Sequence, residues 1–331
     1  MFCTQLFVTL PNEIEKSPVM RKVIGIGETV LDIIFRNGQP TAAVPGGSTY
    51  NAIISLARCG VDTTFISEVG DDRVGDEIIN FLKDNGAKTE FVSRFPNTKS
   101  PISLAFLNEN NDAEYIFYKD HPNDRLEFVC PDIQPDDIIL FGSYYAVNPV
   151  IRAQVEGLLQ KGREKGAIIY YDVNFRPSHQ HEVMKLMPNL LENLGYADFV
   201  RGSHEDFEVL YQKTDVDLVY NSEVSFYCQH FIYTRGANPV EVRGKNGFRH
   251  SYPVPPSDQI VSTIGAGDNF NAGFIFGLLK YGITREVLER GMNEAEWNQV
   301  IACAQQFSAE CCRDIHNYVS KEFGEREKVK K

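Results

Sequence analysis

One carboxylate, Asp268, directly follows three small residues, Gly265, Ala266 and Gly267. Small residues let the backbone approach a ligand closely. Apolar residues recur at helical spacing after Asp268, so we expect a helix to begin here, and the unpaired N–H groups of a helix start suit an anion. A carboxylate beside a bound anion can act as a base toward an attacking hydroxyl. Aspartate is also a favoured helix cap, so these residues alone leave a structural role open.

Two further groups near the start of the chain could bind a polar ligand. The adjacent Gly46 and Gly47 permit close backbone contact, and Asn51 adds an amide a few residues later. Asp32 lies inside an apolar stretch, where a carboxylate is costly to bury unless it is paired. It could accept two hydroxyls of a ligand or face solvent on a half-exposed strand, and the glycines could form an ordinary tight turn.

The glycine fingerprints of two common nucleotide sites are incomplete. Gly25 and Gly27 end an apolar run, but Val30 stands where a dinucleotide-binding fingerprint needs its third glycine. No G-x-x-x-x-G-K-[ST] segment occurs in the sequence. Neither a dinucleotide site nor a P-loop is therefore predicted.

Composition excludes several classes of function. The 331 residues are 43% hydrophobic and 24% charged, as in ordinary globular proteins, and the formal net charge is -12. An acidic surface repels phosphate backbones, which argues against a nucleic-acid partner but allows a nucleotide held by local N–H groups. No apolar run reaches the ~18 residues needed to cross a bilayer, so no membrane association is predicted. Seven cysteines without a C-x-x-C pair indicate free thiols in a reducing cytoplasm.

Apolar runs and helical periodicities alternate along most of the chain. Such alternation indicates an α/β fold with a largely parallel sheet. Helices are expected at 49–58, 75–85, 149–165, 182–194, 268–279 and 294–312. Strands are expected at 23–27, 64–67, 138–141, 167–173 and 199–200, and the region 221–252 is strand-rich.

A second, smaller sheet is expected to interrupt this alternation. Asn37-Gly38 is a strong signal for a hairpin turn. The extended segments 102–107 and 114–118 flank a polar turn and predict another hairpin. We therefore expect a small β-sheet from about 36–44 and 93–118 to project from the main sheet as a lid.

The two ends of the chain lie outside the pattern. Residues 1–21 lack the basic start and long apolar centre of a signal peptide, so we expect a disordered extension, with Met20 as an alternative start. Residues 321–331 are mostly charged, and we expect a frayed tail. No repeat or linker divides the remainder, which predicts a single domain over 22–320.

Four motifs, in this order, resemble the ribokinase/PfkB family of carbohydrate kinases. They are a GE-x-x-x-D strand ending at Asp32, a PGGS-x-x-N loop ending at Asn51, a D-x-N-x-R segment ending at Arg176 and a TIGAGD helix start ending at Asp268. The resemblance covers about residues 22–315. It implies a ribokinase-like, doubly wound α/β sandwich with a small β-sheet lid over the sugar, and ATP along the C-terminal half.

The resemblance also implies roles for individual residues. Asp268 matches the catalytic base, and the N–H groups of Gly265, Ala266 and Gly267 match an anion hole for charge moving off the γ-phosphate. The family's sugar-binding positions fall on Asp32, Gly46, Gly47, Asn51 and Arg176. Its nucleotide-binding positions fall on Ser203, Thr234, Gly236, Gly265 and Gly267. For Arg176, a structural salt bridge is the alternative.

Several positions depart from the family pattern, although ATP and Mg²⁺ are the expected cofactors. Ser203 and Asp206 replace the asparagine and glutamate of an N-x-x-E motif tied to magnesium. Asp206 still offers a carboxylate to a magnesium-bound water. Ser262 replaces an aspartate that helps to form a monovalent-cation site in many relatives, which makes K⁺ activation doubtful. Pro239 replaces the last glycine of the T-x-G-x-x-G nucleotide loop.

The expected acceptor is a small sugar with a primary hydroxyl. The segment 117–119 resembles the F-Y-R segment of fructokinases and 2-keto-3-deoxygluconate kinases, and Ser48 stands where ribokinases often have lysine. A fructokinase-like activity is therefore favoured over ribokinase, ketodeoxygluconate kinase and nucleoside kinase.

Two further expectations concern other classes of role. The departures at Ser203, Asp206 and Ser262 leave open a non-catalytic sugar or nucleotide sensor on a kinase fold. A sensor does not need the base, so the intact GAGD element argues for an enzyme. Relatives often pair across the edges of the lid sheet, which predicts a homodimer through the lid.

Overall fold

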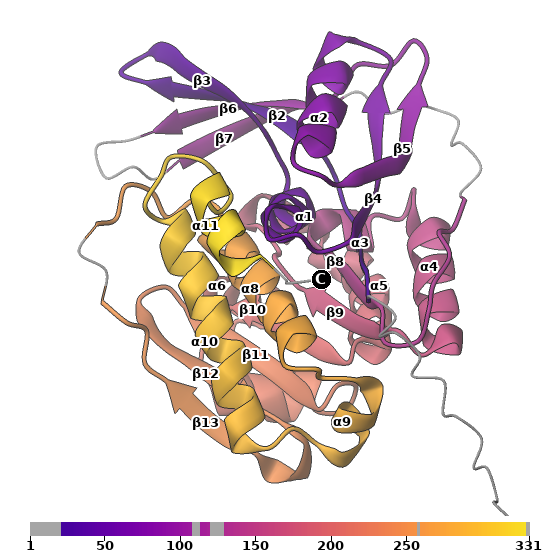
Figure 1. Ribbon diagram of the computed structural model, residues 1–331, viewed down its shortest axis with the longest axis vertical. Helices are drawn as coiled ribbons and strands as arrows, with labels where there is room; N and C mark the ends of the chain where they lie inside the picture. The colour runs from indigo at the N-terminus through magenta and orange to yellow at the C-terminus, as the bar shows by residue number, and fades with distance from the viewer. Residues whose placement is uncertain (1–20, 108–112, 120–128, 257–258, 329–331) are drawn as a thin grey trace, which may run out of the picture.

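The computed structural model describes residues 21–107, 113–119, 129–256 and 259–328 (Figure 1). Within these ranges a large sheet has nine strands in the order β13-β12-β11-β10-β9-β8-β1-β4-β5. Their bounds are β1 Val23–Ile26, β4 Thr63–Gly70, β5 Lys88–Phe95, β8 Ile138–Gly142, β9 Ile168–Asp172, β10 Phe199–Ser203, β11 His230–Arg235, β12 Asn238–Arg243 and β13 Arg249–Tyr252. Neighbours from β5 to β11 run parallel, whereas β12 and β13 are antiparallel additions at one edge. The predicted α/β fold with a largely parallel sheet is confirmed.

Helices cover both faces of this sheet because its strands are apolar on both sides. In β8, Ile138 and Leu140 join the core of one face, and Ile139 and Phe141 join that of the other. The first face carries α1 Ser48–Arg58, α2 Arg73–Asp84, α8 Ala266–Lys280, α9 Arg285–Arg290, α10 Glu294–Cys311 and α11 Lys321–Glu327. The second carries α3 Ser143–Val147, α4 Arg152–Lys165, α5 Val183–Tyr196, α6 His204–Tyr211 and α7 Val216–Val219. Burial on both faces is typical of parallel sheets.

The four-stranded sheet at the top left of Figure 1 has the order β3-β2-β6-β7. Its strands are β2 Val30–Arg36, β3 Gln39–Gly46, β6 Ile102–Leu107 and β7 Ala113–Tyr118. Asn37 and Gly38 join β2 to β3 with φ of 52° and 74°, as a two-residue hairpin turn requires. The predicted small sheet is confirmed, but its bounds were wrong in two places. It begins at Val30, and residues 93–95 belong to β5 of the large sheet.

The C-terminal segment differs from the expected frayed tail. Residues 321–327 form α11, and Phe323 is 1% exposed. Gly324 lies so close to α1 that a Cβ would be 2.6 Å from the carbonyl oxygen of Arg58. Burial of an aromatic ring stabilises a segment that is otherwise charged, and this explains the ordered helix. Most of the predicted N-terminal extension, residues 1–20, lies outside the described residues.

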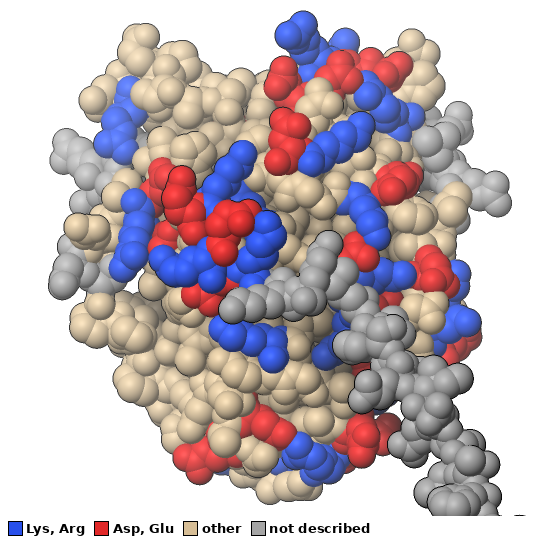
Figure 2. Space-filling view, viewed as in Figure 1, with Lys and Arg blue, Asp and Glu red and all other residues tan. Residues whose placement is uncertain are grey.

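The surface and the thiols agree with the composition. On the face drawn in Figure 2, Lys and Arg side chains are interspersed with Asp and Glu side chains. None of the helices in the described ranges is both long and apolar enough to cross a membrane. The six cysteines that the structure describes are free.

Candidate active site

A cleft of about 780 Å³ lies between the small sheet and the carboxyl ends of the large sheet's strands. Its lining includes Asp32 of β2, Gly47 and Asn51 at the start of α1, Arg176 after β9 and Asp268 of α8. Parallel strands place their carboxyl ends at one edge of a sheet, and open α/β sheets bind ligands there. The fold therefore brings five predicted residues from distant segments into one space.

Asp268 lies in the first turn of α8, and two residues of α1 hold its carboxylate. Ser48 Oγ donates to Oδ1 at 2.8 Å, and Asn51 Nδ2 donates to Oδ2 at 2.8 Å. The N-cap of α8 is Gly265, which has a φ of 78°. Both oxygens of Asp268 therefore accept hydrogen bonds from a different helix, which contradicts the alternative that this residue only caps α8.

The electrostatic surroundings of Asp268 suit a base. Burial raises the pKa of its carboxyl above the ordinary range, and the hydrogen bonds from Asn51 and Ser48 oppose this shift. The negative charge of Asp172 raises the pKa further, whereas the positive charge of Arg176 lowers it. A carboxylate with a raised pKa accepts a proton more readily from a hydroxyl.

Three polar groups converge on Gly46, which has no side chain to displace them. A Cβ at this glycine would lie 2.8 Å from Asp32 Oδ2, 3.6 Å from Asn317 Nδ2 and 3.7 Å from Asn51 Oδ1. The Oδ1 atom of Asn51 is buried and has no hydrogen-bond partner among the described residues. Two acceptors and one donor in this arrangement can bind adjacent hydroxyls of a sugar.

Asp32 is buried and paired rather than exposed to solvent. It is 7% exposed and accepts a hydrogen bond from Ser103 Oγ of β6. Burial raises the pKa of Asp32 to about 6, although the Ser103 hydroxyl opposes the shift. The solvent-facing alternative is therefore contradicted.

Gly47 allows α1 to approach the segment between β1 and β2. It is the N-cap of α1 and has a φ of 131°, a conformation that favours glycine. A Cβ there would lie 2.3 Å from the carbonyl oxygen of Glu28. The glycine pair thus places Ser48 and Asn51, which bind the carboxylate of Asp268, against the wall of the cleft.

The cations in the wall of the cleft include Arg176 and Lys119. Arg176 is exposed and has neither a hydrogen bond nor an ion pair within the described part of the chain, so a structural salt bridge is not seen there. Lys119, directly after β7, is ion-paired with Glu28. Arg176 is therefore the more available of these two cations for an anionic ligand.

The N–H groups expected to form an anion hole lie where α8 begins. The Ala266 N–H donates to the Thr263 carbonyl at 3.2 Å, so part of its capacity is used within the turn. Gly267 packs against the guanidinium of Arg201, since a Cβ at this glycine would lie 3.0 Å from Arg201 Nη2. A buried positive charge therefore lies behind this helix start, a feature the sequence did not predict.

The residues expected near the metal form a helix cap instead of an open ligand set. Ser203 donates to Asp206 Oδ2 through its N–H at 2.6 Å and its Oγ at 2.9 Å. The Phe175 N–H donates to Asp206 Oδ1 at 2.8 Å. Ser203 and Asp206 make a capping box at the start of α6, and Asp206 is 5% exposed.

Of the residues expected to bind the nucleotide, Thr234 and Gly236 lie at and beyond the end of β11, Ser203 ends β10, and Gly265 and Gly267 lie at the start of α8. Thr234 pairs with Ser203 across the parallel strands, and its Oγ1 accepts from Arg201 Nη2 at 2.8 Å. Gly236, with a φ of 56°, turns the chain into β12. Ser203, Thr234 and Gly236 do not line the cleft that contains Asp268.

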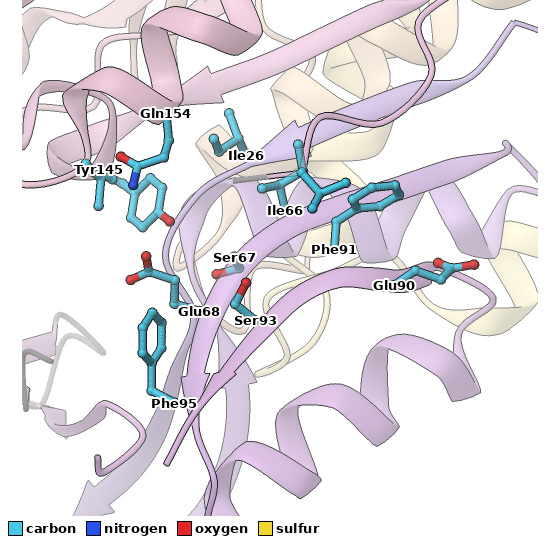
Figure 3. Close-up of a pocket in the computed structure, with 12 residues that line it drawn as sticks. Ile26, Ile66, Ser67, Glu68, Glu90, Phe91, Ser93, Phe95, Tyr145 and Gln154 are labelled. Atoms are coloured by element: carbon cyan, nitrogen blue, oxygen red, sulfur yellow. The ribbon is translucent and has the colours of Figure 1, made fainter. Parts of the chain in front are cut away.

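A smaller pocket of about 100 Å³ continues from this cleft (Figure 3). The two spaces share Glu68, Phe95, Tyr145 and Ile151 in their walls. Figure 3 shows Tyr145 and Gln154 facing Glu68 and Phe95 across the pocket. It forms part of the same depression as the candidate site.

Comparison with known proteins identifies the family. A model of the pfkB family of carbohydrate kinases matches residues 20–314. The chain belongs to this family. It is therefore a sugar kinase, and the predicted family and enzyme class are confirmed. ATP binding is implied by membership of the family.

The relatives of this pfkB kinase are named for two different sugar substrates. The chain is 28% identical to the 5-dehydro-2-deoxygluconokinase of Geobacillus thermodenitrificans (strain NG80-2) over 289 residues, which cover 81% of this chain and 84% of the relative. It is 26% identical to a fructokinase of Rhizobium leguminosarum bv. trifolii over 267 residues, 77% and 79% of the two chains. The crystal structure of Vibrio cholerae O395 fructokinase with fructose, ADP and calcium ion has a TM-score of 0.78 at 20% identity, covering 90% of this chain and 94% of that one. The ribokinase-like fold is confirmed.

The described part of this pfkB kinase offers no protein cage for a cation. The described residues contain no group of three or more His, Cys, Asp and Glu side chains that could hold a metal. Mg²⁺ commonly keeps several waters and binds substrate phosphates, so the site is compatible with Mg·ATP. Ser262, where the family resemblance led us to expect a cation-binding aspartate, accepts a hydrogen bond from the Ile264 N–H at 3.2 Å.

Three residues of the site were missed in the sequence. Ser103 and Asn317 belong to segments without a recognisable motif, and only the fold brings them to Asp32 and Gly46. Arg201 lies inside an apolar strand, and a charged residue in a buried strand is a signal that could have singled it out.

Proposed function

We propose that this kinase transfers the γ-phosphate of ATP to a primary hydroxyl of a small keto sugar of the fructose type. The observation that carries the proposal is the carboxylate of Asp268, held by Ser48 and Asn51 inside the cleft that also contains Asp32. A base whose two oxygens are fixed from one side can direct its remaining lone pairs toward one bound hydroxyl.

The residues then divide the work of transfer. Asp268 orients the acceptor hydroxyl and takes its proton, while Asp32, Asn51 and Asn317 bind neighbouring hydroxyls of the sugar. The N–H groups at the start of α8 face the developing negative charge, which the helix dipole favours. When Mg·ATP is bound, the metal would supply further charge neutralisation at the phosphates. The small sheet closes the cleft against water, a competing acceptor.

A keto sugar acid is the second candidate acceptor. Arg176 lines the cleft without a partner among the described residues, and a guanidinium binds carboxylate well. Curated relatives named 5-dehydro-2-deoxygluconokinase agree with this possibility. An acceptor with a carboxylate would depend on Arg176, whereas fructose would depend on it much less.

An ADP-release assay tests both candidates. The panel contains fructose, ribose, a purine nucleoside, 2-keto-3-deoxygluconate and 5-dehydro-2-deoxygluconate, each with Mg·ATP. We expect the highest kcat/KM with fructose. The second candidate would be favoured if kcat/KM were higher with either acid than with fructose and if that value fell by at least about tenfold in Arg176→Met. Arg249→Met, on β13 at the far edge of the large sheet, is the control. Sugar binding without turnover on any substrate would contradict both.

We also propose a second copy of the chain as the partner of the small sheet. β3 and β7 are the edges of this sheet, and edge strands offer unpaired backbone groups. Its outer face is apolar, with Phe106, Ile116 and Tyr118 exposed. Light scattering after size exclusion should give a dimer, and Ile116→Lys should give a monomer; a wild-type monomer at micromolar concentration would contradict this pairing.

A further inference from the structure

Ser48 lies between two carboxylates, although its hydroxyl has one proton. Its Oγ is 2.8 Å from Asp268 Oδ1 and 3.4 Å from Asp172 Oδ2. The shorter distance assigns the proton to the hydrogen bond with Asp268. Asp172 is a competing acceptor for the same proton. Its negative charge must therefore be neutralised by another group if Ser48 is to donate to Asp268.

Arg201 binds the competing carboxylate from the other side. Its Nη1 donates to Asp172 Oδ1 at 3.0 Å, and its Nη2 donates to Thr234 Oγ1 at 2.8 Å. Arg201 is 7% exposed, and its Nε is buried without a hydrogen-bond partner among the described residues. A buried guanidinium with an unsatisfied N–H is costly, which points to a role beyond packing.

Arg201 also contacts the helix that carries the base. Its guanidinium lies against Gly267, where a Cβ would be 3.0 Å from Nη2 and 3.2 Å from Nη1. It also lies 5.9 Å from the centre of the Phe270 ring. One side chain therefore joins β9, through Asp172, to the first turn of α8.

We propose that Arg201, Asp172 and Ser48 form a relay that positions the carboxylate of Asp268 for proton transfer. This inference rests on the proposed kinase function and names positioning residues for it. Arg201 anchors Asp172 and offsets its charge. Because Arg201 holds Asp172, Ser48 can donate its proton to Asp268 rather than to Asp172. The free lone pairs of the Asp268 carboxylate then point toward the sugar.

Like charges make this arrangement sensitive to the loss of Arg201. The charged or titratable groups around Asp268 are Asp32 of β2, Asp172 of β9, Arg176 after β9, Arg201 of β10 and Cys311 of α10. The charge of Asp172 raises the pKa of Asp268. Removing Arg201 leaves that charge uncompensated, so the pKa of Asp268 should rise further. Removing both members of the pair should bring it back.

The pH dependence of kcat/KM tests the relay. In Arg201→Met we expect the acid limb to move to higher pH by about one unit, with kcat reduced and the KM for ATP little changed. Arg201→Lys keeps the charge and should move the limb less. The double variant Arg201→Met/Asp172→Asn should return it toward the wild type. Ser48→Ala removes a donor to Asp268 and should also shift it upward.

Arg243→Met is the matched control. Arg243 of β12 is 5% exposed and forms an ion pair with Asp217 of α7. Its replacement therefore removes a buried arginine from the sheet that also contains Arg201. Both variants should lose stability in urea, but only Arg201→Met should move the acid limb. Equal pH profiles for the two, or no return in the double variant, would overturn the relay.

A second readout separates this inference from the proposed function. Carbon-detected NMR of labelled aspartate gives the pKa of Asp268 in the free protein, assigned by comparison with Asp268→Asn. It should rise in Arg201→Met and fall back in the double variant whether or not a sugar is turned over. Failure of the sugar panel with these shifts present would count against the proposed substrate alone, and unchanged NMR titration would reject the relay alone.

Discussion

Asp32 of β2 and Asp206 of α6 are both buried, yet their oxygens are used differently. Asp32 accepts one hydrogen bond from Ser103 and keeps Oδ2 beside the space around Gly46. Asp206 has both oxygens bound, to Ser203 and Phe175. A buried carboxylate with unused lone pairs is prepared for a ligand, whereas a saturated one stabilises its own fold. Burial alone therefore does not mark a binding residue.

The largest expected effect concerns Asp268, the proposed base, which lines the cleft as Asp32 does and as Asp206 does not. Asp268→Asn keeps the hydrogen-bonding shape but cannot accept the hydroxyl proton, so kcat should fall by about 10²–10⁴-fold. Calorimetry should show sugar binding within a few-fold of the wild type.

Asp215→Asn is the control for that substitution. Asp215 accepts from the Leu218 N–H and caps α7, and asparagine caps a helix about as well as aspartate, so Asp215→Asn should leave both stability and kcat close to the wild type. Unchanged turnover in Asp268→Asn would remove this residue from the chemistry.

The next effect contrasts the two buried aspartates directly. Asp32→Ala should raise the KM for the sugar by about 10–100-fold, because a charge-assisted hydrogen bond to a hydroxyl is lost. Asp206→Ala should instead lower the free energy of unfolding by about 2–4 kcal/mol, because it removes the capping box and leaves buried N–H groups unpaired. Steady-state kinetics and urea unfolding measure the two outcomes. If Asp206→Ala raised the Mg²⁺ requirement of a stably folded enzyme, the saturated carboxylate would have a ligand role after all.

The smallest effect concerns stability and pH. Because burial raises the pKa of Asp32 to about 6, the folded chain binds this proton more tightly than the unfolded chain. Stability should therefore fall as the pH rises from about 4 to 6, and Asp32→Asn should be more stable than the wild type at pH 7 by about 1–3 kcal/mol. Urea unfolding at pH 4 should show almost no difference. Asp132→Asn, whose side chain is 76% exposed, should show none at either pH; a more stable wild type at pH 7 would be inconsistent with a desolvated Asp32.

The elements with strong local signals were predictable from the sequence. Asn37-Gly38 demands a hairpin, and the apolar spacing after Asp268 demands a helix, in agreement with β2–β3 and α8. α6 was missed although Ser203 and Asp206 have the spacing of a capping box, because that spacing was interpreted as a degenerate metal motif. The helix α11 is stabilised by the packing of Phe323 in the core beside α1. This tertiary contact has no local signal in the sequence.

The site divides in a similar way. Asp32, Asn51 and Asp268 were predicted because the order of their motifs resembles that of the pfkB family, and the fold brings them together in one cleft. Asn317 was not, because its chemistry comes from an approach to Gly46 that no spacing encodes. Arg201 was overlooked because its partner Asp172 lies on another strand of the sheet.

The docking of the C-terminal segment has a consequence for biosynthesis. Asn317 reaches the cleft because the residues after it are secured: the Val319 N–H bonds to Ser55, and α11 packs on α1. A nascent chain can pair its strands before residues 317–327 leave the ribosome, but the part of the cleft wall that Asn317 forms is then missing. A ligand of this cleft can therefore stabilise the chain that has docked α11 by mass action, while a chain still in synthesis gains little from it.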